Sequence, residues 1–182
     1  RETPISKVEG PVSAILADVK QRGDAAVLEY TRRFDRCDIN ALAVTAEEIE
    51  EAFAQVEPEF LEVLERAAAN IREFHTAQVR QSLVLTPRSG VVLGQRITPI
   101  ERVGLYVPGG TAAYPSTVLM DAIPAKIAGC SQIVMVTPPS AAGKVNPVIL
   151  AAAKIAGIDR IFKVGGAQAI AALAYGTESI PK

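Results

Sequence analysis

Apolar residues change their spacing near residue 80, and this change divides the chain into two patterns. In the first part they recur every three or four positions, as on one face of an amphipathic helix. The predicted helices are two short ones within 10–36 around Gly23, one that starts at 46, and one from Pro58 to about Val79. Thr45 and Glu48 have the spacing of a capping box, which fixes the start of the third helix.

Between Ser82 and Arg102 the apolar period shortens. The runs LVL, VVLG and RITPI are typical of short strands, and Arg88–Gly90 supplies the residues of a tight turn between the first two. We therefore expect an α+β segment here, with a hinge to the rest of the chain near 97–102.

From Arg102 onward, β-type runs alternate with helical ones. The predicted order is strand 102–107, helix 115–128, strand 132–137, helix 147–156, strand 160–164 and helix 166–175. Pro115 and Pro147 suit first helical positions, and Asn146 suits an N-cap. Gly129 and Gly157 stand where a left-handed residue ends a helix.

This alternation predicts a parallel sheet with right-handed crossovers. The fold class is α/β, with a helical α+β segment over 1–100 and a βαβαβα unit over 101–182. A further strand is expected after the helix that ends at Gly176, so the sequence is interpreted as a fragment of a larger protein.

Glycine-rich turns follow the first and last strands of this unit, at Pro108-Gly109-Gly110 and Gly165-Gly166. Parallel sheets bind ligands at the carboxyl ends of their strands, and helix amino ends attract phosphate or carboxylate. We expect the strands that end at Tyr106 and Val164 to lie side by side, so that the two turns form one pocket rim.

Two side chains at this edge are candidates for ligand contact. Tyr106 could stack on a ribose or base and offer its hydroxyl, and Gln168 could give a directed amide hydrogen bond. Structural alternatives remain for each: the glycines as plain tight turns, Tyr106 as a core ring, and Gln168 as a solvated helix residue. The dinucleotide fingerprint G-x-G-x-x-G is absent, and Thr137 stands where an acidic ribose ligand is usual.

Composition narrows the function classes. The net charge is −1 and Trp is absent, so neither nucleic acid nor an anionic membrane surface is an expected partner. No apolar run approaches the ~18 residues of a membrane span. Cys37 and Cys130 form no CxxC pair, which favours a reducing, cytoplasmic setting, although a disulfide stays open. We expect Cys130, just before a strand, to be a buried thiol.

Groups for catalysis are scarce. His75 is the single histidine, and its helical context favours a packing or surface role over a metal ligand. Asp121 and Glu178 lie near the proposed edge without an evident partner, and Ser116 and Ser179 lack a base. The polypeptide by itself is expected to be catalytically inert, with no metal ligand set of its own.

Three strings, VGLYVPGG, YPSTVLMDAIPAKIAGC and VGGAQAIAALAYGTESIPK, closely resemble the amino-terminal portion of histidinol dehydrogenases. GDAAVLEYTRRFD and IREFHTAQ upstream resemble the same family. The resemblance implies an incomplete Rossmann-like NAD-binding domain within a zinc- and NAD-dependent homodimeric enzyme. Such enzymes oxidise L-histidinol to L-histidine in histidine biosynthesis.

Within the resemblance, the family's NAD contacts map onto Tyr106 and Gln168. Its catalytic Glu-His pair, zinc ligands and histidinol-binding residues lie downstream of the matching strings and map onto no residue here. Two alternatives stay open: a non-catalytic α/β binding or assembly module, and another α/β nucleotide-binding protein unconnected with histidine.

Overall fold

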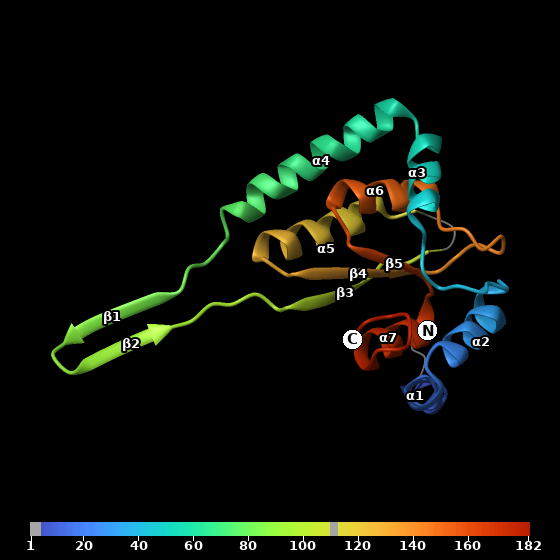
Figure 1. The fold of residues 1–182 in the computed structure, drawn as a ribbon, viewed down its shortest axis with the longest axis horizontal. Coiled ribbons are helices and arrows are strands. Elements are labelled where there is room, and N and C mark those ends of the chain that lie inside the picture. Colours follow the sequence, from blue (N-terminus) through green and yellow to red (C-terminus); the bar gives the residue numbers. More distant parts are fainter. Residues whose placement is uncertain (1–4, 110–112) are drawn as a thin grey trace.

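The computed structural model describes residues 5–109 and 113–182. Four helices come first, followed by a hairpin and then by an alternation of strands and helices (Figure 1). The elements are α1 (Ile5–Arg22), α2 (Asp24–Asp35), α3 (Ala46–Gln55), α4 (Pro58–Thr76), β1 (Leu83–Arg88), β2 (Val91–Gln95), β3 (Arg102–Tyr106), α5 (Pro115–Ala128), β4 (Gln132–Thr137), α6 (Pro147–Ala156), β5 (Arg160–Lys163) and α7 (Gly166–Tyr175).

The predicted α/β fold class is confirmed. Strands β3, β4 and β5 form one parallel sheet, with Arg102 opposite Gln132 and Val134 opposite Arg160. Helices α5 and α6 connect these strands and pack on each other. The chain therefore winds in one direction from β3 through β4 to β5, as right-handed crossovers require.

Both faces of the sheet are covered, and the core is accordingly in two parts. Along β4, Met135 belongs to the cluster formed with α3, α4, α5 and α6, whereas Val134 and Val136 belong to the cluster formed with α1, α2 and α7. Figure 1 shows these helix groups on opposite sides of the sheet. Burial on both faces explains why β4 reads as an unbroken apolar run rather than an alternating one.

One edge of the sheet is closed by a segment from the first part of the chain. The Val44 N–H donates to Ile161 O at 2.9 Å, and the Lys163 N–H donates to Leu42 O at 2.7 Å. Residues 42–44 thus add a short antiparallel rung to β5. Among the described residues, no strand pairs with the outer edge of β3.

The predicted starts of α3 and α6 and the predicted ends of α5 and α6 are confirmed by their caps, whereas α1 begins before residue 10 and α4 ends at Thr76 rather than near Val79. Thr45 and Glu48 form the capping box of α3, and the Asn146 side chain accepts a hydrogen bond from the Val148 N–H at 2.9 Å. Gly129 and Gly157 are left-handed, at φ 90° and 75°, and end α5 and α6. The third run of the middle segment, RITPI, forms no strand, contrary to the prediction.

One expectation about strand order is wrong. β4 lies between β3 and β5, so the strands that end at Tyr106 and Val164 are not neighbours. This order follows from the connections between the strands. Helices α5 and α6 cross the same face of the sheet, so β4 is added next to β3 and β5 next to β4, in sequence order. The carboxyl ends of all three strands nevertheless meet at one edge.

The division into segments 1–100 and 101–182 stays a prediction. What the structure shows is extensive packing between the two: α3 and α4 pack on α5 and α6, and α1 packs on α7. Cys37 is a buried free thiol, whereas Cys130, also free, is only partly buried, because it ends the α5 turn before β4 begins.

Gly165→Ala is expected to destabilise the fold by about 1–3 kcal/mol, since a Cβ at this position would lie 2.8 Å from Pro138 Cβ in a packed interior. Gly94→Ala is the matched control, because its nearest neighbour, Leu83 O, is 3.5 Å away. Urea unfolding of both variants checks the difference. Equal stability of Gly165→Ala and the parent would contradict the close contact.

Candidate functional site

The two glycine turns meet at one proline. A Cβ on Gly109 would lie 2.6 Å from Pro138 Cγ, and a Cβ on Gly165 would lie 2.8 Å from Pro138 Cβ. Pro138 follows β4, so it sits between the ends of β3 and β5. Close packing therefore requires glycine at both positions, and the ends of the three strands form one continuous edge. Gly110 lies outside the described residues.

Tyr106 connects the first strand with the last helix. The backbone N–H of Gly166, the first residue of α7, donates to the Tyr106 hydroxyl oxygen at 3.0 Å. A phenol can donate one hydrogen bond while it accepts another, so the hydroxyl hydrogen stays available. The ring packs with the cluster of α1, α2 and α7. Tyr106 thus packs its ring in the core, as one alternative in the sequence analysis held, and also presents its hydroxyl at the strand ends.

Gln168 is almost completely buried, at 1% exposure, so its interpretation as a solvated helix residue is wrong. Its Oε1 has no hydrogen-bond partner among the described residues, and a Cβ on Gly166 would lie 2.7 Å from this oxygen. A buried carbonyl oxygen without a partner costs about 1–3 kcal/mol. The side chain is therefore a strong candidate for a hydrogen bond to a bound group.

The amino ends of the helices differ in how their free N–H groups are satisfied. In α6, Asn146 caps the first turn, and the N–H groups of Val148, Ile149 and Leu150 all donate to Asn146. In α7, the preceding Gly165 gives no side-chain cap, although the Gly166 N–H donates to the Tyr106 hydroxyl. Uncapped N–H groups together with the helix dipole attract anions. Of these two helix ends, α7 is the one suited to a phosphate.

The topology of the sheet indicates a ligand site at this same edge. Helices α5 and α6 cover one face of the sheet, and α7 covers the other (Figure 1). The chain therefore changes face after β5, and α7 runs back beneath β3, where Leu173 lies against Gly104. In doubly wound sheets, the point where the winding reverses is where ligands bind. That point lies here at the carboxyl end of β3, beside Tyr106.

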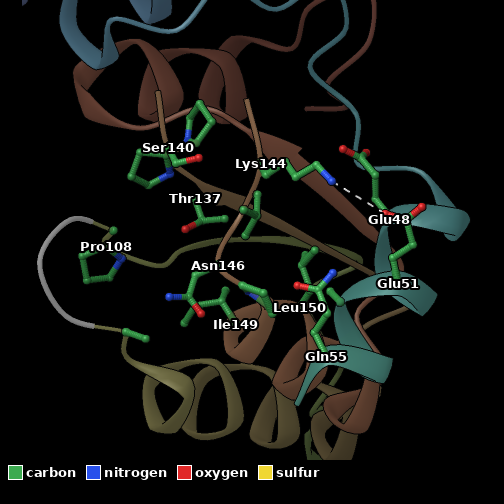
Figure 2. A pocket seen from close by; sticks show the side chains of 17 residues that line it. Glu48, Glu51, Gln55, Pro108, Thr137, Ser140, Lys144, Asn146, Ile149 and Leu150 are labelled. Carbon is green, nitrogen blue, oxygen red and sulfur yellow. Dashed lines mark ion pairs between the residues drawn. The ribbon is translucent and has the colours of Figure 1, made fainter. Parts of the chain in front are cut away.

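A cavity of about 480 Å³ opens at the same edge, on the side of α3 and α6 (Figure 2). This size suits a nucleoside-sized group. Its lining combines the ends of β3 and β4 with two helices, through Glu48, Glu51, Ala52, Gln55, Pro108, Gly109, Ala113, Thr137, Pro138, Pro139, Ser140, Lys144, Val145, Asn146, Pro147, Ile149 and Leu150.

The charged side chains that line this cavity, Glu48, Glu51 and Lys144, each have an ion-pair partner. Lys163 Nζ lies 2.9 Å from Glu48 Oε1, and Lys144 Nζ lies 3.8 Å from Glu51 Oε2, the pair drawn as a dashed line in Figure 2. Burial raises the pKa of Glu48, but the Thr45 N–H and the Lys163 ammonium outweigh it and hold this pKa below its ordinary value. The cavity therefore presents no excess positive charge for a phosphate.

Sequence reasoning found part of this edge. Pro108 and Gly109 line the cavity, whereas Tyr106 and Gln168 do not; those two lie on the α7 side of Pro138. The contributions of α3 were missed. Glu48 was recognised only as a capping residue, and nothing local in the sequence indicates that α3 lies against the ends of β3 and β4.

Other candidates have structural roles. Glu178 accepts a hydrogen bond from the Asp24 N–H at 2.8 Å, which lowers its pKa, and Ser179 donates to Asp24. Burial raises the pKa of Asp121. His75, partly buried on α4, pairs with Gln78.

The described residues contain no group of three or more His, Cys, Asp or Glu side chains that could hold a metal ion. The residues present therefore do not fit a zinc site. None of the described helices combines the length and apolar character that crossing a bilayer requires.

The fold and this edge define an α/β protein with a parallel sheet of the Rossmann-like kind and a candidate ligand site where its strands end. The sequence profile of histidinol dehydrogenase matches residues 1–182. The chain therefore belongs to the histidinol dehydrogenase family.

Individual relatives agree with this assignment. Histidinol dehydrogenase from Syntrophotalea carbinolica is 56% identical over 183 residues, covering 100% of this chain and 42% of the relative. The protein of that name from Clostridium acetobutylicum is 53% identical over 171 residues, covering 94% and 40%. The crystal structure of the Elizabethkingia anophelis histidinol dehydrogenase superposes with a TM-score of 0.93 at 38% identity, over 100% of this chain and 41% of that one. The chain thus spans about two-fifths of the length of these relatives.

Glu48→Gln is expected to destabilise the fold at neutral pH by about 1–3 kcal/mol, because it leaves the nearly buried Lys163 ammonium without its charged partner. The pKa of Glu48 is lowered in the folded state, so its contribution is complete above the ordinary value of 4.5 and disappears as pH falls through the folded-state value.

The difference in unfolding free energy between parent and Glu48→Gln should therefore narrow below pH 4.5. Glu59→Gln, on the exposed first turn of α4, is the control and should show no such pH dependence. A difference that stays constant from neutral to acid pH would contradict the ion pair.

Proposed function

We propose that this chain supplies part of the NAD site of a histidinol dehydrogenase, which oxidises L-histidinol to L-histidine. One observation carries the proposal. At the amino end of α7, which has no side-chain cap, the Tyr106 hydroxyl accepts the Gly166 N–H, and the buried Gln168 Oε1, without a partner among the described residues, lies close to Gly166. Both belong to the residues, Tyr106 and Gln168, onto which the family resemblance maps its NAD contacts.

The chemistry of these groups fits a dinucleotide. Tyr106 is held by Gly166 with its hydroxyl hydrogen free, so it can donate to a ribose or phosphate oxygen. Gln168 Oε1 is an acceptor and suits a ribose hydroxyl or an amide N–H of the ligand. The amino end of α7 suits the pyrophosphate because negative charge is stabilised there, with the Gly166 N–H already donated to Tyr106.

The cavity on the other side of Pro138 gives the rest of the ligand a place. It is large enough for a nucleoside, and its paired charges suit an uncharged base or ribose better than a phosphate. We infer that the dinucleotide crosses the strand ends over Pro138, with its pyrophosphate on the α7 side.

In this function, NAD supplies the hydride acceptor when it is bound. The residues of this chain bind and orient the cofactor. The described residues contain no cluster of side chains that could hold a metal ion. We infer that proton transfer and zinc binding depend on other parts of the family's chain, and that this chain alone does not turn over L-histidinol.

The remaining assignments follow from the family and are part of the proposal. They are a homodimeric assembly, a role in histidine biosynthesis, and a cytoplasmic location. The family match over residues 1–182 favours this function over a non-catalytic binding module and over an unrelated nucleotide-binding protein.

Tyr106→Phe is expected to weaken NAD binding about tenfold, because one hydrogen bond to a charged or strongly polar ligand group is lost. Gln168→Leu should weaken it to a similar extent. Tyr175→Phe is the control, since this tyrosine is exposed at the far end of α7. Isothermal titration of NAD into each variant measures the effect, with thermal melting to confirm folding.

Unchanged NAD affinity in both Tyr106→Phe and Gln168→Leu would overturn the site. Equal affinity for NAD, ATP and a sugar phosphate would favour the unrelated nucleotide-binding class instead. NADH formation from L-histidinol by this chain alone would contradict the inference that catalysis needs other parts of the family's chain.

A further inference from the structure

The middle strand of the central sheet ends without an acidic residue. In nucleotide-binding sheets of this kind, an Asp or Glu further along the unit hydrogen-bonds the ribose 2′-hydroxyl of NAD, whereas a nearby Arg accommodates the 2′-phosphate of NADP. Here β4 ends at Thr137, which is buried at 1% exposure and lines the cavity of about 480 Å³. The strand itself therefore carries no group that distinguishes the two dinucleotides.

Helix α3 brings carboxylates to the wall of the same cavity. Glu48 and Glu51 lie one turn apart on this helix, and both line the cavity together with Thr137 (Figure 2). The oxygens of Glu48 are engaged, since they lie 2.9 and 3.2 Å from Lys163 Nζ, and one of them accepts the Thr45 N–H at 2.9 Å. Glu48 therefore has little capacity for a ligand, and Glu51 is the carboxylate that remains.

Glu51 has acceptor capacity left. Its ion-pair partner among the described residues is Lys144, whose Nζ lies 3.8 Å from Glu51 Oε2, a separation longer than a hydrogen bond. The Glu51 side chain is 64% exposed. Because an ionised carboxylate offers two oxygens with about four acceptor sites, Glu51 can accept from both hydroxyls of one ribose.

The helix end that opens into this cavity is closed to phosphate. Asn146, Pro147, Ile149 and Leu150, at the start of α6, all line the cavity. Pro147 has no N–H, and the N–H groups of Val148, Ile149 and Leu150 all donate to Asn146. The first turn of α6 thus has no free N–H group to offer an anion, although helix amino ends generally bind anions.

The charges of the lining also disfavour a phosphate. Among the described residues, the lining holds two carboxylates, Glu48 and Glu51, one ammonium group, Lys144, and no arginine. A phosphate monoester carries about −1.5 to −2 charge at neutral pH. A 2′-phosphate would therefore meet Glu51 as a like charge, and like charges at a binding site are a common means of rejecting a competing ligand.

The floor of the cavity suits the adenosine half of NAD. It contains the buried apolar side chains of Ala52, Val145, Ile149 and Leu150. Adenine is uncharged, whereas the nicotinamide ring of oxidised NAD carries a positive charge that is costly to remove from water. The ribose in this cavity is thus the adenine ribose, the one that bears the 2′-phosphate in NADP.

We propose that Glu51 makes this chain select NAD over NADP. Its carboxylate accepts hydrogen bonds from the hydroxyls of the adenine ribose and repels a 2′-phosphate at the same position. The selecting acid thus comes from α3, ahead of the sheet in the sequence, and replaces the acid that Thr137 lacks. This assignment rests on the proposed function, because it takes the cavity as part of the NAD site.

Isothermal titration at one fixed ionic strength tests it, with NAD, NADP and NAD lacking the 2′-hydroxyl of the adenine ribose. The parent chain is expected to bind NADP and the deoxy analogue at least about tenfold more weakly than NAD, because a hydrogen bond to a charged group is lost or a repulsion is added. In Glu51→Ala, all three affinities should lie within about threefold of one another. Thermal melting confirms that each variant is folded.

Two further variants separate the causes. Glu51→Gln keeps an acceptor but removes the charge, so it should raise NADP affinity relative to NAD while it keeps part of the preference for NAD over the deoxy analogue. This variant also carries the test if Glu51→Ala does not fold. Glu50→Ala is the matched control, because Glu50 is the adjacent residue of α3, pairs with Lys154 and does not line the cavity. Its affinity ratios should equal those of the parent.

Equal affinity of the parent for NAD and NADP would overturn the assignment of Glu51. So would unchanged ratios in Glu51→Ala, or a change of equal size in Glu50→Ala, which would indicate an effect of overall surface charge. In each of these cases, NAD binding that Tyr106→Phe weakens would leave the proposed function standing. If neither dinucleotide binds to the parent, the proposed function and the role of Glu51 are both wrong.

Discussion

Burial of β4 on both faces is the constraint on which the rest of this structure depends. A strand with apolar side chains above and below needs a helix layer on each side. The chain supplies one layer from α5 and α6, which are also the crossovers, and most of the other from α1, α2 and α7. Because α7 must cover the second face, the chain changes sides after β5, and this change places the amino end of α7 beside Tyr106. The position of the candidate ligand edge is thus a consequence of how the core is closed.

Much of the fold could be predicted from local sequence signals. The capping box at Thr45, the Asn146 cap and the glycines that end α5 and α6 act within a few residues, and each predicted boundary is confirmed. Strand order was not predictable in this way. Turn residues at Gly109 and Gly165 indicate where strands end but not which strands are neighbours, and the intervening position of β4 follows from winding. The pairing of residues 42–44 with β5 joins segments more than a hundred residues apart and leaves no local signal.

The candidate site, like the fold, could be predicted from local sequence signals only in part. Tyr106 and Gln168 were found because they stand next to glycine turns and match family strings, whereas the hydrogen bond that joins Tyr106 to Gly166 depends on how α7 packs. The contribution of α3 to the cavity could not be inferred, because Glu48 already has a local role in its capping box. The same carboxylate caps a helix and pairs with Lys163 at the end of β5, so one residue positions α3 against the sheet and lines the cavity.

The short antiparallel rung at residues 42–44 has a consequence for how the central sheet behaves in a crowded solution. It blocks one side of the sheet to further hydrogen bonding, so growth is possible only alongside β3. Among the described residues, two molecules that met through this side would each use up the free edge of their central sheet. That sheet could then not recruit a third molecule, so it is protected from open-ended polymerisation into fibres.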